Sequence, residues 1–301
     1  MEKITSRQMK IMDALREIEN GRATDISKEV NLPWSSLERE LNQLCKIGYV
    51  KCTDRIYSIN TCKEYICGIN ITDEKTVIVI ADLYFKIKEV ITIESDENVY
   101  QTIDNAINKA LEYIDEKTTK FSNIFITTAE DLDIIEDFLS WDMKDRFKVN
   151  NMNAYIIEPI KAVLSVTKTK KDIKSVAYVN SKGVRCATQI GNQRLISKKN
   201  KLDNKYCTIS EFKDEKNIER IVNLFHNYLS IIGNDKLYVY SSEIVSSDFL
   251  TKMFYKSIEV NLLVGSCDNF EHELSQDTSD KLALGAAICG YYNTAIDNKK
   301  K

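Results

Sequence analysis

The first twenty residues carry apolar side chains at the spacing of a helix. Ile11, Leu15 and Ile18 recur at intervals of four and three residues, which places them on one face of a predicted first helix. Asn20 and Gly21 follow directly and predict the end of that helix. The chain therefore begins with an amphipathic helix whose apolar face needs a partner.

The next segment predicts two more helices separated by a tight turn. Thr24 or Asp25 can cap a short helix, and Asn31 with Leu32 makes the turn after it. Pro33 suits the first position of the following helix, because the backbone N–H that proline lacks is not needed there. The inward stripe of this following helix consists of Leu37, Leu41 and Leu44.

Two short strands are predicted after these helices. Gly48 fits the left-handed residue that ends a helix. Residues 49–52 and 55–58 then alternate like the strands of a hairpin around a turn at Thr53–Asp54. Helix, turn, helix and hairpin in this order are typical of a winged helix-turn-helix domain, whose recognition helix enters the major groove of DNA. The alternative is a helical hairpin that contacts no DNA, because a leucine stripe alone indicates only a buried core.

Several side chains of this domain are candidates for contact with double-stranded DNA. The recognition helix presents its N-terminal residues to base edges, and the candidates there and in the hairpin are Trp34, Ser35, Ser36, Arg39, Lys46 and Arg55. Glu38 and Glu40 lie on the same helix, and Lys and Arg only balance Asp and Glu over residues 1–60. Since phosphate contacts supply much of the affinity for DNA, one nearly neutral domain binds weakly. We therefore expect a homodimer.

The rest of the chain alternates strands and helices in two rounds. The first round comprises residues 65–71, 75–83, 86–93, 99–115, 123–127, 132–139, 147–149 and a helix at 154–166 that contains Pro159. The second comprises residues 175–180, 184–190, 194–197, 218–231, 236–240, 247–255, 260–264 and a closing helix at 280–292. The pattern predicts an α/β body in two lobes, residues 65–166 and 173–295, after an α+β winged domain at residues 1–60.

Segments along the chain resemble the ROK family of repressors, open reading frames and sugar kinases. After the winged domain come CGINITDEKTVIVIADLYFKI, VNNMNAYII and DKLALGAAICGYY, in the order of the family. The chain is most similar to the repressor branch, which includes the N-acetylglucosamine and xylose operon repressors. The resemblance implies an actin-like (ribonuclease-H-like) sugar-kinase fold in two lobes, with a sugar cleft between them.

The phosphate loop and the catalytic residue of the family kinases are altered here. The loop D-I-G-G-T-K aligns with residues 70–75, where Thr72 and Asp73 replace glycines that let the backbone approach a phosphate. The catalytic aspartate aligns with Asn151, and an amide cannot accept a proton from a sugar hydroxyl.

Other family motifs are reduced as well. One glycine remains in the second phosphate turn, residues 180–184, and Ser241–Ser242 replace the glycines on the adenosine side. Only Cys207 stands where the family has its zinc-binding residues, in a shortened segment at 192–215. We therefore expect no cofactor, no metal and no enzymatic activity, although a drifted loop on a retained scaffold gives the same pattern.

Composition adds few constraints. A net charge of −3 with 43% hydrophobic residues is ordinary for a globular protein. The N-terminus lacks the apolar core of a signal peptide, and the longest apolar run, near residues 77–81, is too short to span a bilayer. We expect a cytoplasmic protein without a membrane partner, whose eight cysteines are free buried thiols.

A polar cluster in the body is the candidate ligand site. If the cleft binds a small-molecule effector such as a sugar, its expected lining is Asn150, Asn151, Asn153 and Glu158. The alternative is that Asn151 or Asn153 caps a helix beginning at Ala154.

These features predict a DNA-binding transcriptional regulator, a repressor with a non-catalytic, pseudokinase-like body for dimerisation and ligand sensing. Two alternatives remain open. The first is a ROK-type sugar kinase that tolerates altered loops. The second is a protein-interaction module without a DNA target, which the near-neutral first domain keeps open.

Overall fold

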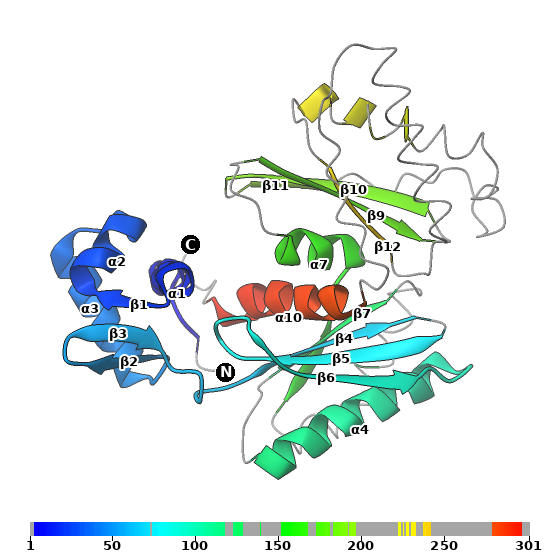
Figure 1. Cartoon of the computed structure of the whole chain (residues 1–301), viewed down its shortest axis with the longest axis horizontal. Coiled ribbons are helices and arrows are strands. Elements are labelled where there is room, and N and C mark those ends of the chain that lie inside the picture. The colour runs from blue at the N-terminus through cyan, green and yellow to red at the C-terminus, as the bar shows by residue number, and fades with distance from the viewer. Residues whose placement is uncertain are drawn as a thin grey trace.

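The protein has an N-terminal head beside a larger body that contains two sheets (Figure 1). The computed structural model describes residues 3–72, 74–117, 123–128, 139, 152–167, 173–180, 183–191, 193–196, 222–223, 225, 227–228, 230–232, 237–241 and 279–296. Within this part of the chain, no helix is long and apolar enough to cross a membrane.

The head consists of helices packed on a small antiparallel sheet of order β1-β3-β2. Its elements are α1 (Ser6–Ile18), β1 (Asn20–Arg22), α2 (Ala23–Val30), α3 (Trp34–Lys46), β2 (Val50–Thr53) and β3 (Ile56–Ile59). The predicted inward stripe of Leu37, Leu41 and Leu44 is confirmed, since all three are fully buried. Gly48 has a φ of +81°, as expected for the left-handed residue after the helix.

The start of α2 differs from the prediction. The helix begins at Ala23, so neither Thr24 nor Asp25 precedes it. The Asp25 carboxylate instead accepts a hydrogen bond from the backbone N–H of Arg22 at 3.0 Å, and it does so from within the first turn. An acidic side chain there also interacts favourably with the positive end of the helix dipole. The prediction that Thr24 or Asp25 precedes the helix is therefore wrong, but Asp25 does stabilise its first turn.

The hairpin also differs by one residue. Its turn is Asp54–Arg55 rather than Thr53–Asp54, with φ values of 52° and 63°. Two successive positive φ values define the tight turn whose twist matches that of the flanking strands. The segment after α1 does end that helix as predicted, but it continues as β1 and pairs with β3. This third strand was not predicted.

The first sheet of the body has the order β6-β5-β4-β7-β8. Its strands are β4 (Ile66–Ile71), β5 (Lys75–Ala81), β6 (Ile87–Glu94), β7 (Asn123–Thr128) and β8 (Asn153–Ile156). β4, β5 and β6 form an antiparallel meander, whereas β7 and β8 run parallel to β4. Helix α4 (Val99–Lys117) covers one face through Ile103, Ile107 and Ala110.

The second sheet repeats this plan, with the order β11-β10-β9-β12. Its strands are β9 (Ile173–Asn180), β10 (Gly183–Ile190), β11 (Gln193–Ile196) and β12 (Tyr238–Ser241). An antiparallel meander is again followed by a parallel strand, which agrees with the two predicted rounds. The described residues between 222 and 232 are helical, while the elements predicted at 147–149, 247–255 and 260–264 lie outside the described residues.

The helix predicted at residues 154–166 is two elements. β8 occupies Asn153–Ile156, and α7 (Pro159–Val166) begins at the proline itself, with Glu158 preceding it. Proline lacks the N–H that an interior helical position requires, so it favours the first turn. Because Asn153 lies in a strand, the prediction that it caps a helix at Ala154 is wrong.

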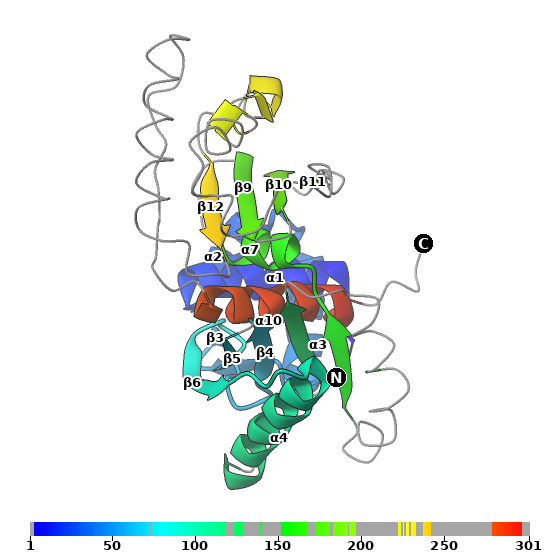
Figure 2. The ribbon, with the colours of Figure 1, turned by 90° about the vertical axis from the view of Figure 1, so that its right-hand side faces the viewer.

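Helix α10 (Ser279–Ala295) lies between the first sheet and α7, as Figures 1 and 2 both show. The predicted lobe boundaries placed it in the second lobe, but it packs on β4, β5 and β7. A Cβ atom on Gly68 of β4 would lie 1.9 Å from the Ala283 carbonyl oxygen. On the opposite side, a Cβ on Gly285 would lie 2.2 Å from the carbonyl oxygen of Ala162. Small residues therefore let this helix be enclosed on both sides.

The cysteines divide into two groups. The six within the described residues are free, as expected, but only Cys67, Cys186 and Cys289 are buried. Burial raises the pKa of the Cys67 and Cys186 thiols to about 12, so both stay protonated and unreactive.

The enclosure of α10 predicts an unusual response to a helix-favouring substitution. Alanine in place of glycine ordinarily stabilises a helix interior by about 1 kcal/mol. We expect Gly285→Ala to lower the free energy of unfolding by about 1–3 kcal/mol, because α7 and α10 must separate. Urea denaturation measures this, with the exposed Asn293→Ala on the same helix as the control. An increase in stability for Gly285→Ala would contradict the packing.

Candidate functional site

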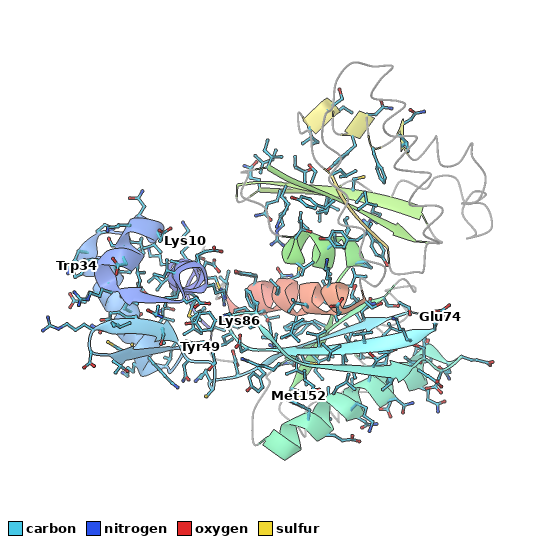
Figure 3. All side chains as sticks on the ribbon, viewed as in Figure 1. Lys10, Trp34, Tyr49, Glu74, Lys86 and Met152 are labelled. Atoms are coloured by element: carbon cyan, nitrogen blue, oxygen red, sulfur yellow. The ribbon has the colours of Figure 1, made fainter. Side chains whose placement is uncertain are left out.

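The outward face of α3 is a continuous polar surface. Because the leucines fix the opposite face inward, the side chains at positions 35, 38, 39, 42, 43 and 46 are exposed. They line an open hollow of about 420 Å³, and they are Ser35, Glu38, Arg39, Asn42, Gln43 and Lys46. Trp34 begins the helix and points outward at the far side of the head from the body (Figure 3).

Arg39 is partly held against its own helix. Its Nη2 lies 3.0 Å from Oε1 of Glu40, and its side chain remains 61% exposed while that of Glu40 is 6% exposed. The second Glu40 oxygen, Oε2, is buried without a hydrogen-bond partner among the described residues. Glu40 therefore faces inward rather than toward a ligand, and Glu38 is the exposed acidic residue of the pair noted in the sequence.

The predicted DNA-binding residues occupy two places in the head. Ser35, Arg39 and Lys46 share the exposed face of α3, whereas Ser36 is half-buried. Arg55 lies at the tip of the β2–β3 hairpin and is exposed. The structure thus places Ser35, Arg39 and Lys46 on one surface and Arg55 on a separate projection.

Two residues of this surface, Asn42 and Gln43, were not predicted from the sequence. Asn42 and Gln43 lie on the same face, one turn further along α3, a spacing that could have identified them. The Gln8 side-chain amide of α1 donates to Oε1 of Gln43 at 3.0 Å, which fixes α1 beside α3. Arg7 and Lys10 are exposed cations on α1, three residues apart, and Lys3 is an exposed cation before that helix begins.

Arg16 of α1 anchors the head to the body. Its Nε donates to the Leu83 carbonyl oxygen at 2.8 Å, and its guanidinium carbon lies 4.0 Å from the ring centre of Phe85. Nη1 contacts Asp13 at 2.6 Å, and the hydroxyl of Tyr292 on α10 donates to the same carboxylate. Only 7% of the Arg16 side chain is exposed, so this charge is largely removed from water between the two parts of the protein.

Four further contacts lie at the same junction. The Tyr84 hydroxyl accepts a hydrogen bond from the Ile59 N–H at 3.0 Å and donates to the carbonyl oxygen of Glu19. The Ile4 N–H donates to the carbonyl oxygen of Ala295, at the end of α10, at 2.9 Å. Lys86, which Figure 3 places between head and body, pairs with the Glu19 carboxylate at 2.6 Å. That last pair is exposed and therefore contributes little.

Two of the four residues of the predicted sugar-contacting cluster, Asn153 and Glu158, lie within the described part of the chain. Asn150 and Asn151 lie outside the described residues. Asn153 and Glu158 lie at opposite ends of β8, and the Asn153 amide donates to Asn123 at 3.4 Å. Glu158 is bound by Lys161 and Arg185, each at 2.7 Å. Burial alone would raise the pKa of the Glu158 carboxyl, but these two cations hold it below its ordinary value.

Two other polar side chains occupy the interior at the ends of the central parallel strands. Asn70 of β4 and Thr127 of β7 are register partners, and both are buried. The Asn70 amide nitrogen and the Thr127 hydroxyl lack hydrogen-bond partners among the described residues. Ligands of α/β sheets commonly bind beyond such carboxyl ends. This pair was not predicted from the sequence, because Asn70 and Thr127 are more than fifty residues apart along the chain.

Thr72 and Lys75, at the two ends of the β4–β5 turn, are hydrogen-bonded to each other. The Thr72 N–H and hydroxyl donate to the Lys75 carbonyl oxygen at 3.0 and 2.7 Å. The Lys75 N–H in turn donates to the Thr72 hydroxyl at 3.2 Å. These backbone donors are therefore engaged and are not directed at a phosphate. The described residues also contain no group of three or more His, Cys, Asp or Glu side chains that could hold a metal ion.

Comparisons with known proteins rest on structure alone, since no protein-family model and no curated protein matches the sequence. The structure of a ROK family transcriptional regulator, described as a homolog of the E. coli MLC protein, is similar with a TM-score of 0.63 and 10% identity. The similarity covers 96% of this chain and 99% of that one.

Sugar kinases share the fold over a smaller part of the chain. A ROK hexokinase from Thermus thermophilus matches with a TM-score of 0.50 and 10% identity, over 76% of this chain and 99% of that one. A ROK family glucokinase from Streptomyces griseus, in complex with glucose and AMPPNP, matches with a TM-score of 0.50 and 10% identity. That match covers 74% of this chain and 98% of the glucokinase. The predicted actin-like, two-lobed α/β fold is confirmed. The regulator's match is extensive enough that it must include most of the head.

The Arg16 junction predicts a selective loss of stability. Arg16→Met removes the hydrogen bond to Leu83 and leaves that carbonyl group without its donor, so we expect a decrease of about 2 kcal/mol in the free energy of unfolding. Arg7→Met, on the exposed side of the same helix, is the matched control and should change little. Equal effects of the two substitutions in urea denaturation would contradict the anchoring role.

Proposed function

We propose that this protein is a DNA-binding transcriptional regulator of the ROK family, a repressor whose winged head reads DNA and whose sugar-kinase-like body is non-catalytic. The observation that carries this proposal is the exposed polar face of α3, displayed on a head of helices and hairpin. The extent of the similarity to a ROK regulator, 96% of the chain, supports it. The kinases match only 74–76% of the chain.

In the proposed complex, α3 lies in the major groove. Arg39 contacts a base or the nearest phosphate, and Lys46 contacts the backbone. The exposed cations of α1 lie beside α3 because Gln8 is bonded to Gln43. They are positioned for phosphate contacts, while Arg55 at the hairpin tip reaches the adjacent groove or backbone.

The body carries the assembly of this regulator. A nearly neutral head supplies limited electrostatic affinity, so two heads held on paired half-sites are needed for tight binding. We place the dimer contact in the body, because most of the exposed large apolar side chains among the described residues lie there.

The body also has features of a ligand sensor without catalysis. Asn151 replaces the family's catalytic base, and the Thr72–Lys75 turn engages its own donors. The buried amide of Asn70 and hydroxyl of Thr127 are suited to sugar hydroxyls. A sugar effector is therefore the proposed ligand class. We propose Asn70 and Thr127 as its binding residues in place of Asn153 and Glu158, which lie at opposite ends of β8.

A sugar kinase is the second candidate, because kinases of this fold match most of the body. A protein-interaction module without a DNA target is the third. Recovery of genomic fragments bound by the full chain tests the first proposal against both. We expect a small set of enriched fragments that share a two-fold symmetric site. No enrichment above a bead-only control would reject the regulator proposal.

Arg39 should be needed for specific binding. If it contacts a guanine, Arg39→Ala should weaken binding to the selected site by about 1–3 kcal/mol. Lys28→Ala is the matched control, since it removes an exposed cation of the head outside the α3 face. Fluorescence anisotropy measures both affinities. An unchanged affinity in a folded Arg39→Ala protein would remove this residue from the interface.

Nucleotide should not bind. With the glycines replaced at Thr72, Asp73 and Ser241–Ser242, we expect no calorimetric heat from millimolar Mg-ATP and no phosphorylation of any hexose. A saturable heat, or transfer of phosphate to a sugar, would instead support the kinase candidate.

The protein should be a dimer in solution. Light scattering at micromolar concentration should give the mass of two chains, and removal of residues 1–60 should leave that ratio unchanged because the body holds the contact. A single-chain mass for a protein that binds its DNA site tightly would contradict this arrangement.

A further inference from the structure

Asn42 lies at the centre of the exposed face of α3. Ser35, Glu38, Arg39 and Asn42 are spaced at i, i+3, i+4 and i+7, so they point in one direction from the helix. The recognition helix of homeodomains uses the same spacing for its base-contacting side chains. A helix in the major groove therefore brings Asn42 to base edges if it brings Arg39 there.

The oxygen of the neighbouring amide, Gln43, is already engaged within the protein. Gln43 accepts a hydrogen bond from Gln8 at 3.0 Å, and Gln8 is itself held by the Thr5 N–H, which donates to Oε1 at 2.8 Å. This chain of bonds makes Gln43 part of the contact between α1 and α3. Its amide thus has a structural role in the free protein.

Asn42 has a different environment. It is exposed, and its side chain makes no hydrogen bond within the described residues. Its carbonyl oxygen and its amide nitrogen are both available to a ligand. Arg39, one turn earlier, is by contrast drawn toward the Glu40 carboxylate. Of the two amides on this face, Asn42 is the one whose oxygen and nitrogen are both without a partner within the described residues.

One base presents the complementary pair of groups. In the major groove adenine offers the N7 acceptor beside the N6 amino donor, which a single side-chain amide can bind through two hydrogen bonds. Guanine presents two acceptors at that edge, and cytosine presents a donor. An amide therefore distinguishes adenine from both.

We propose that Asn42 is a specificity-determining residue that reads an adenine in each half-site. The proposal rests on the proposed DNA-binding function and adds to it the base that one position requires. Gln43 holds the helix in place, and Asn42 selects the sequence.

Selection of bound sequences from a randomised duplex pool tests this, using the full-length wild type, Asn42→Ala and the matched control Gln43→Ala. Wild type should favour A·T at one position of each half-site by about tenfold. Asn42→Ala should lose that preference and keep the others. Gln43→Ala should retain the preference for A·T, at lower overall stability because the hydrogen bond from Gln8 is lost.

A second variant gives a readout that a structural role would not produce. Asn42→Asp converts the amide into an acceptor-only group, which accepts from the amino group of cytosine. The selected base at the same position should change from adenine to cytosine, with weaker binding overall because a negative charge is added near phosphates.

The outcomes distinguish a failure of the Asn42 proposal from a failure of the proposed DNA-binding function. An adenine preference that persists in Asn42→Ala, or a wild-type consensus without an adenine at that position, overturns the role of Asn42 and leaves DNA binding intact. If no variant, including wild type, enriches or retains any duplex at low salt, then DNA binding itself is rejected and the role of Asn42 with it.

Discussion

The close packing of α10 is the constraint on which the arrangement of this protein depends. Its glycines and alanines bring the helix backbone against the first sheet on one side and against α7 on the other, where added Cβ atoms have no room. The same helix ends at the head, where Ala295 accepts from Ile4 and Tyr292 contacts Asp13. One element thus contacts the first sheet, α7 and the head.

The charges of the head are used in two different ways. Arg16 is buried at the junction, where aromatic rings and a carbonyl oxygen surround it, and it serves position rather than recognition. Lys3, Arg7 and Lys10 remain exposed. Glu40 faces inward and is paired with Arg39, so Glu38 is the exposed acidic residue of α3. A net charge near zero over residues 1–60 therefore still leaves exposed cations before and on α1 and on α3.

Elements with strong local patterns could be predicted from the sequence. The leucine stripe of α3 and the alternating strands were identified because burial imposes a period. β8 and α7 were merged because Pro159 fits both a kinked helix and a helix start. The placement of α10 depends on contacts with β4, more than two hundred residues earlier, which no local period reveals. Asn42 follows Arg39 by three residues, so its place on the exposed face could be predicted from the sequence. The pairing that distinguishes Gln43 from Asn42 could not, because it depends on the contact between α1 and α3.

In the proposed function, the heads of two chains bind the DNA backbone, each through a few exposed cations. The most direct measurement is the affinity of the full chain for its selected duplex across a range of salt concentrations. Each phosphate contact contributes about −0.9 to the slope of log K against log salt. With Arg7, Lys10 and Lys46 engaged in each of two heads, six phosphate contacts predict a slope of about −5. Binding that does not weaken with salt, or no binding at low salt, would contradict it.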